Sequence, residues 1–160
     1  MQPMNENITR RHMGWILAGL GTASGHAQTK PAGTTIHREI DYKATPARIY
    51  AALLDARQFS ALTKEPAEIQ PQPGAPFKLF GGMIEGRNVE LVPDQRIVQA
   101  WRPAAWTPGV YSIVKFELVA RGSGTRIVLD HAGFGADQQE SLSEGWEGHY
   151  WEPLRKYLDG

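Results

Sequence analysis

The chain has 160 residues, with 17 Lys or Arg against 17 Asp or Glu, so its formal net charge at neutral pH is zero. This length suits one domain with a substantial core, and the even balance excludes both the basic surplus of a nucleic-acid-binding protein and the acidic excess of a disordered one. The sequence has no cysteine, which excludes disulfides, thiolate catalysis and cysteine-ligated zinc.

The N-terminal stretch has the features of an export signal. Arg10 and Arg11 precede an apolar run, residues 13–23, that is too short to span a bilayer as a helix. Gly25 and Ala27 then supply the small residues that a signal peptidase requires at positions −3 and −1. The pattern resembles a twin-arginine signal, although Met13 and Gly14 stand where phenylalanine and leucine are commonest.

We therefore predict a signal peptide over residues 1–27, cleaved after Ala27, a linker over 28–34 and a single domain over 35–160. The mature protein would be periplasmic or secreted. The alternative is a cytoplasmic protein whose N-terminal helix frays.

The domain begins with a strand and two helices. Ile36, Ile40 and Tyr42 lie on one parity of an alternating segment, which predicts a strand. Thr45 and Pro46 then form a helix start, because a hydroxyl caps the first turn and proline needs no N–H there. We expect this helix to run to about residue 55 and a second, short helix near residues 58–63.

The middle of the chain is rich in strand signals separated by proline and glycine. The predicted strands cover residues 77–80, 83–92, 97–102, 111–120 and 125–132. Pro93 and Asp94 predict a turn that joins two of them into a hairpin, with Val89 and Leu91 before it and Trp101 after it.

A long amphipathic helix is predicted over residues 138–158. Its apolar stripe consists of Leu142, Trp146, Tyr150, Leu154, Tyr157 and Leu158. An interior proline costs a helix about 3 kcal/mol, but we expect packing of this bulky stripe to outweigh Pro153. The element order predicts an α+β fold in which a curved antiparallel sheet surrounds the terminal helix.

Several stretches of the sequence resemble one known family. They are residues 44–46 (ATP), 49–53 (IYAAL), 77–82 (FKLFGG), 84–86 (IEG), 89–94 (VELVPD), 97–102 (IVQAWR), 145–146 (GW), 150–151 (YW) and 154–158 (LRKYL), together with Trp106. The order of these stretches and their amino-acid sequences resemble the helix-grip (START-like, SRPBCC) superfamily. Within it, the chain is most similar to the C-terminal domain of activators of the 90-kDa heat-shock-protein ATPase and their bacterial homologues.

The resemblance implies a cavity between the sheet and the C-terminal helix, used in the superfamily for lipids, hydrophobic natural products or ring-closing chemistry. The alternative is an ordinary packed core, which would need the same aromatic residues. We expect a small hydrophobic or amphipathic ligand. The expected ligand-binding residues are Phe77, Phe80, Trp101, Trp106, Tyr111, His131, Trp146 and Tyr150.

Two histidines are the candidates for catalysis. His131 and His149 could serve as a general base in a cyclase- or lyase-type enzyme, which is the alternative function. The sequence has no HExxH, GxSxG or phosphate-loop motif, so we expect no metal, no serine nucleophile and no cofactor.

The resemblance also raises the question of a chaperone partner. Eukaryotic activators carry a separate N-terminal domain that contacts the chaperone, and we expect no counterpart of it here. An exported protein would not meet that chaperone. We therefore expect the shared sequence motifs to reflect a common fold and not a common partner. If the N-terminal segment is not an export signal, the remaining alternative is a cytoplasmic chaperone-interaction module. We expect neither a nucleic-acid partner nor a membrane span in the mature chain.

Overall fold

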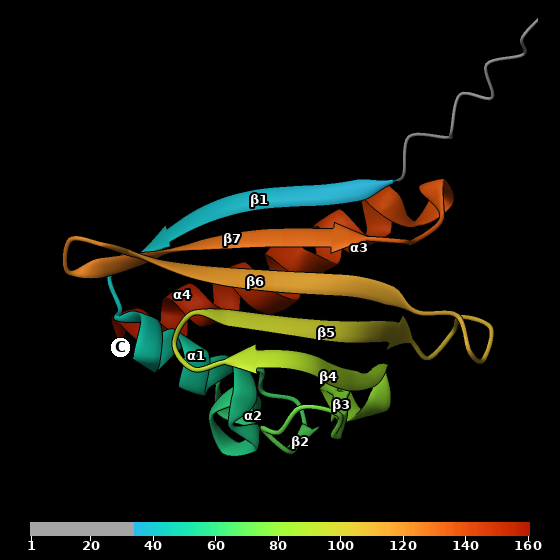
Figure 1. Cartoon of the computed structure of the whole chain (residues 1–160), viewed down its shortest axis with the longest axis horizontal. Helices are drawn as coiled ribbons and strands as arrows, with labels where there is room; N and C mark the ends of the chain where they lie inside the picture. The colour runs from blue at the N-terminus through green and yellow to red at the C-terminus, as the bar shows by residue number, and fades with distance from the viewer. Residues whose placement is uncertain (1–33) are drawn as a thin grey trace, which may run out of the picture. The chain divides into compact units, whose positions relative to one another are not determined.

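The computed structural model describes residues 34–160 (Figure 1). The predicted signal peptide and residues 28–33 of the predicted linker lie outside this range, so both remain predictions. Within the described range, no helix is both long and apolar enough to cross a membrane.

Seven strands form one antiparallel sheet in the order β1-β7-β6-β5-β4-β3-β2 (Figure 1). Their bounds are Thr35–Tyr42 (β1), Glu68–Ile69 (β2), Pro76–Leu79 (β3), Ile84–Val92 (β4), Arg96–Pro103 (β5), Ser112–Arg121 (β6) and Gly124–Ala132 (β7). Every sequential pair from β2 to β7 is adjacent in the sheet, and β1 closes it by pairing with β7. The predicted strands are confirmed, and β2 is an addition that the sequence did not indicate.

Two short helices follow β1, as predicted. Helix α1 (Pro46–Leu54) begins where Thr45 Oγ1 accepts a hydrogen bond from the Arg48 N–H at 3.3 Å. Helix α2 (Ala56–Thr63) starts two residues earlier than expected, because Asp55 Oδ1 accepts from the Gln58 N–H at 2.9 Å and caps a new helix.

The C-terminal helix runs along one face of the sheet (Figure 1). It consists of α3 (Gln139–Trp146), a π-helical segment η3 (Glu147–Trp151) and α4 (Glu152–Asp159), after a short 3₁₀ turn, η2 (Ala136–Gln138). Pro153 lies directly after the π-helical segment, and the helix continues through it. The predicted α+β fold, with two short helices after the first strand and a long terminal helix, is confirmed.

The hairpin between β4 and β5 contains a bulge that the alternation did not reveal. The register shifts between Asn88 and Glu90, and Val89 is 53% exposed. Asn88, the last residue before the shift, points inward, where its side-chain oxygen accepts from Gln99 at 2.9 Å and its nitrogen donates to the Gln70 carbonyl at 2.9 Å. The two buried amides are thereby satisfied, which a buried polar pair requires.

The inner face of the sheet and the terminal helix form the core. Strand β7 alternates throughout between inward and outward residues, β6 does so from Ser112 to Leu118, and His131 shares the inward face with Ile127 and Leu129 as predicted. Three tryptophans, Trp101, Trp146 and Trp151, are at most 4% exposed and bring the helix onto the sheet.

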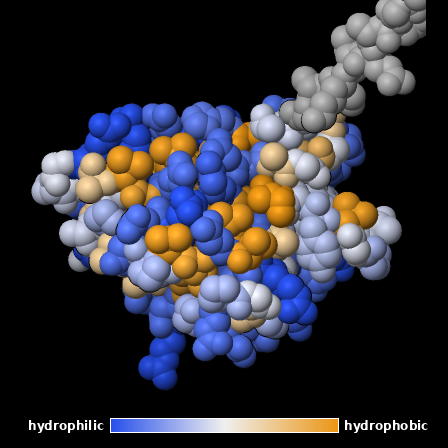
Figure 2. All heavy atoms as spheres, in the orientation of Figure 1, coloured by the Kyte–Doolittle hydropathy of each residue, from blue (hydrophilic) through white to orange (hydrophobic). Residues whose placement is uncertain are grey.

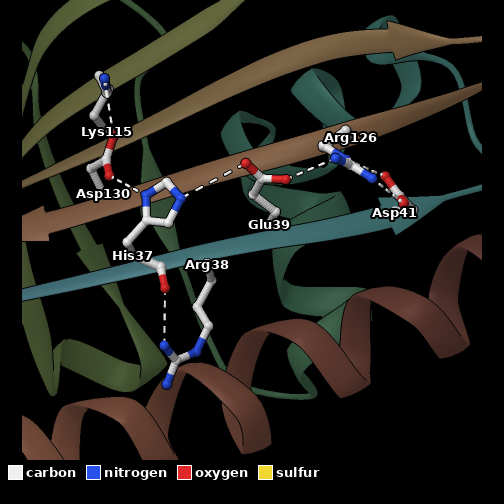
Figure 3. A network of polar contacts seen from close by, with 7 residues as sticks. All are labelled: His37, Arg38, Glu39, Asp41, Lys115, Arg126 and Asp130. Atoms are coloured by element: carbon white, nitrogen blue, oxygen red, sulfur yellow. Dashed lines mark hydrogen bonds and ion pairs between the residues drawn. The ribbon is translucent and has the colours of Figure 1, made fainter.

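The outer face carries charged side chains across β1, β7 and β6 (Figure 3). This ladder consists of His37, Glu39, Asp41, Lys115, Arg126 and Asp130. His37 Nδ1 lies 2.6 Å from Asp130, and Arg126 lies 2.8 Å from both Glu39 and Asp41. These groups are solvated, and the face shown in Figure 2 mixes polar residues with scattered apolar ones. The ladder therefore makes part of this face polar and adds little to stability.

Candidate ligand-binding cavity

A cavity of about 510 Å³ lies between the sheet and the first half of the terminal helix. It is lined by Glu65, Phe80, Met83, Ile84, Trp101, Pro103, Ala104, Ala105, Trp106, Gln138, Ser141, Leu142, Gly145, Trp146, His149 and Tyr150. Most of these residues are apolar. Exposed members such as Met83 lie at its mouth, whereas Trp101, Trp146 and Tyr150 are buried.

Aromatic rings in mutual contact form much of the lining. The rings of Trp101 and Trp146 are nearly parallel, 12° apart in plane, with centroids 4.9 Å apart. The ring centroid of Tyr150 lies 4.6 Å from that of Trp146, in a tilted arrangement, and 5.6 Å from that of Phe80, in an edge-to-face arrangement. Because each ring is braced by another, the lining is held by packing rather than by a ligand.

Arg102 fixes the loop that forms one side of the mouth. Its guanidinium donates to the Trp106 carbonyl at 2.6 Å and the Ala104 carbonyl at 3.2 Å, and pairs with Glu85 at 2.7 Å. Trp106 is held from the other side, because its Nε1 donates to Gln138 Oε1 at 3.3 Å. The Arg102 side chain is only 12% exposed, so it acts as an internal clamp for the loop.

His131 lies next to the cavity wall but does not line it. Its Nδ1 accepts from Trp146 Nε1 at 3.1 Å, so Nε2 carries the proton and donates to Ser112 Oγ at 2.7 Å. Ser112 donates onward to the Trp101 carbonyl at 3.2 Å. Burial lowers the pKa of His131 to about 4. At neutral pH this is an uncharged histidine with both nitrogens occupied.

The structure brings together five of the eight residues expected to bind a ligand, namely Phe80, Trp101, Trp106, Trp146 and Tyr150. Phe77, Tyr111 and His131 lie outside the cavity. Phe77 faces inward but packs against Gly86, and Tyr111 is 46% exposed; both border a separate groove over β2, β3 and β4. His149 lies at the cavity mouth, with its ring centroid 5.7 Å from that of Phe80.

Other lining residues escaped the sequence reasoning because they sit in irregular segments or between stripe positions. Met83 follows the 3₁₀ turn η1 (Phe80–Gly82), and Ala104 and Ala105 belong to the loop after β5. Gly145 precedes Trp146 on the helix, and a β-carbon built there meets no atom within 4 Å. A glycine beside a bulky stripe residue was the one available signal for this open space.

No cluster of three His, Asp or Glu side chains within residues 34–160 is placed to hold a metal ion. Burial raises the pKa of Tyr150 well above its ordinary value, so its hydroxyl stays protonated at physiological pH.

Residues 43–159 match the family described as Activator of Hsp90 ATPase homolog 1-like protein. The chain belongs to this family. Its members share an SRPBCC-type domain, which agrees with the sheet and terminal helix seen here.

Curated relatives are distant and longer. The human Activator of 90 kDa heat shock protein ATPase homolog 1 is 25% identical over 139 residues, covering 84% of this chain and 41% of that protein. The Dictyostelium discoideum homologue is 29% identical over 119 residues, covering 74% and 31%. The chain thus spans about two fifths or less of the length of these two relatives.

Solved structures support the same fold. An HSP90 activator from Plasmodium falciparum has a TM-score of 0.76 at 24% identity, covering 79% of this chain and 97% of that one. CalU16 from Micromonospora echinospora has a TM-score of 0.69 at 21% identity, covering 79% and 76%. The Aha1 dimer from Colwellia psychrerythraea has 0.67 at 20%, covering 78% and 96%. At these identities the similarity concerns fold alone.

Proposed function

We propose that this Activator of Hsp90 ATPase homolog 1-like protein is an exported carrier or sensor that binds a small hydrophobic or amphipathic molecule between its sheet and terminal helix. The observation that carries the proposal is the cavity of about 510 Å³ lined by Phe80, Trp101, Trp106, Trp146 and Tyr150. This volume lies within the range of small-molecule sites, about 300–1,000 Å³.

Ordinary packing does not account for this space. Protein interiors are packed as densely as organic crystals, with few voids larger than a water molecule. Core residues away from the cavity, such as Ile49, Ile97, Val114 and Leu154, are fully buried. An opening bounded by large aromatic side chains that already contact one another supports a ligand site better than incomplete packing.

A carrier fits the site better than an enzyme. His131 has both ring nitrogens engaged by Trp146 and Ser112, so it offers no base to a molecule in the cavity. His149 is at the mouth, but among residues 34–160 no carboxylate forms an ion pair with it; Glu152 pairs with Lys156 instead, at 2.7 Å. A general base usually needs a partner that orients it.

The export part of the proposal rests on Arg10, Arg11, the apolar run and the small residues before Gln28. An exported chain would not meet the chaperone that the relatives' names mention. We therefore propose that the family fold is used here for a small molecule.

Native mass spectrometry of protein purified from its own host tests the ligand directly. We expect a mass above that of the polypeptide, which disappears on denaturation and yields a small molecule in the organic extract. Protein that is empty and also fails to bind the neutral fluorophore N-phenyl-1-naphthylamine would overturn the proposal.

A further inference from the structure

We infer that the cavity takes an uncharged, ring-containing apolar ligand and rejects anions, including fatty-acid carboxylates. This inference rests on the proposed function and adds the chemical class of the ligand.

The first argument is the absence of a cation from the lining. No Lys or Arg is among the residues that line the cavity within the described chain, and the ionisable ones are Glu65, His149 and Tyr150. Removing an anion from water without an opposite charge or several donors costs several kcal/mol or more. The lining carboxylate, that of Glu65, repels an anion.

Arg102, an arginine next to the cavity, already has partners within the protein. Arg102 lies on β5 directly after the cavity residue Trp101, but its guanidinium pairs with Glu85 at 2.7 Å and donates to the carbonyl of Trp106 at 2.6 Å. Redirecting it to a ligand would break the ion pair and release the loop that forms the mouth. The positive charge of Arg102 is therefore neutralised by Glu85 without a ligand.

Some of the donors at the start of the terminal helix are already occupied as well. Helix N-termini often bind anions through free backbone N–H groups. Here the turn η2 uses two of these groups internally: the Gln138 N–H donates to the Gly135 carbonyl at 2.9 Å, and the Gln139 N–H donates to the Ala136 carbonyl. The Gln138 side chain, which lines the cavity, is also engaged, by Trp106 and Asp137.

The aromatic lining supplies the positive part of the argument. Phe80, Trp106 and Tyr150 present faces and edges in several orientations, as the 69° angle between Phe80 and Tyr150 illustrates. Offset and edge-to-face contacts with a ligand ring add about 0.5–1.5 kcal/mol each beyond the burial of area. A ring system gains more here than a flexible chain, which would also lose conformational entropy.

Two fluorophores with one skeleton separate charge from hydrophobicity. N-phenyl-1-naphthylamine is neutral, and 1-anilinonaphthalene-8-sulfonate differs from it by a single sulfonate. In titrations at pH 8 that follow quenching of the protein's tryptophan emission, we expect the neutral probe to bind and the sulfonate to bind at least tenfold more weakly. Equal or tighter binding of the sulfonate overturns this inference and leaves the proposed function standing. Failure of both probes, with protein that is also empty in the native mass spectrum, overturns the proposed function itself.

A charge placed in the cavity provides the matched test. Ser141→Lys adds an ammonium to the lining, whereas Gln139→Lys adds the same charge two residues earlier on the same helix, outside the lining. We expect Ser141→Lys to shift the ratio of the two affinities toward the sulfonate by about tenfold. Gln139→Lys should leave both affinities as they are. An equal shift in both variants, or none in Ser141→Lys, contradicts selection by the charge of the lining.

Discussion

The indole N–H of Trp146, on the terminal helix, donates a 3.1 Å hydrogen bond to Nδ1 of His131, near the end of β7. The bond joins two groups that are at most 2% exposed and fixes the histidine as the Nε2–H tautomer. It also positions the Trp146 ring, which forms part of the cavity wall. One buried contact therefore supports both the fold and the proposed site.

Trp146→Phe and Trp101→Phe remove the same atoms from neighbouring, stacked rings. Trp146→Phe leaves Nδ1 of His131 without a donor, and an unsatisfied buried acceptor costs about 1–3 kcal/mol. Trp101 Nε1 has no hydrogen-bond partner among residues 34–160, so Trp101→Phe carries no such cost. We expect urea denaturation to show Trp146→Phe as the less stable variant by that margin. Equal losses would mean that the hydrogen bond contributes nothing.

Stability should depend on pH through His131. Its pKa is about 4 when folded and near 6.5 when unfolded, so between these values the unfolded chain binds more protons. The free energy of unfolding is therefore unaffected by this group above pH 6.5 and falls by roughly 3 kcal/mol as the pH is lowered to 4.

The measurement is urea denaturation at several pH values, compared between the wild type and His131→Gln. The rings and hydroxyl around His131, from Trp101, Ser112, Phe134 and Trp146, do not titrate in this range. The difference between the two proteins thus isolates the histidine from the carboxylates elsewhere. Parallel pH profiles would contradict the lowered pKa.

Filling the cavity should block ligand binding without harming the fold. An added β-carbon meets no atom within 4 Å at either Gly145 or Gly148, and only Gly145 lines the cavity. We expect Gly145→Leu to weaken binding of N-phenyl-1-naphthylamine at least tenfold in a fluorescence titration, because the new side chain occupies the space. Gly148→Leu is the control and should bind as the wild type does. Undiminished binding by Gly145→Leu would place the ligand elsewhere.

Two Gly→Ala changes should have opposite effects on stability. A β-carbon at Gly86, in β4, would lie 2.0 Å from the Ala100 carbonyl oxygen and 2.6 Å from the Phe77 ring, so the strands or the ring must move. We expect Gly86→Ala to cost about 3 kcal/mol or more in thermal or urea unfolding. Gly145→Ala, in open space on a helix, should add about 0.5–1 kcal/mol. Similar effects at both sites would refute the packing argument at Gly86.

N-terminal sequencing of the protein expressed in its own host tests export. We expect the mature chain to start at Gln28 in the fraction outside the cytoplasm. Replacing Arg10 and Arg11 by lysine should leave the unprocessed chain inside, because the twin-arginine route reads the arginine pair. A mature protein that retains Met1 or Met4 would instead revive a cytoplasmic role.

The sequence by itself determined the elements and their order. Local chemistry is sufficient for this: Thr45 and Pro46 start a helix, Pro93 and Asp94 make a turn, and the β6 alternation of Val114, Phe116 and Leu118 sets a buried face. The stripe of Trp146, Tyr150 and Leu154 likewise predicted a helix that packs on the sheet, and the resemblance named the family correctly.

Only the tertiary structure decided which of these inward residues line the cavity and which are fully packed against other residues. Phe77 and Phe80 are three residues apart and both buried, yet Phe77 packs against Gly86 across the sheet and Phe80 lines the cavity. His131 has the alternation of a cavity residue, but Trp146 and Ser112 occupy both its nitrogens. Periodicity fixes the direction in which a side chain points. What it meets there depends on residues distant in the chain, and the sequence does not encode those contacts locally.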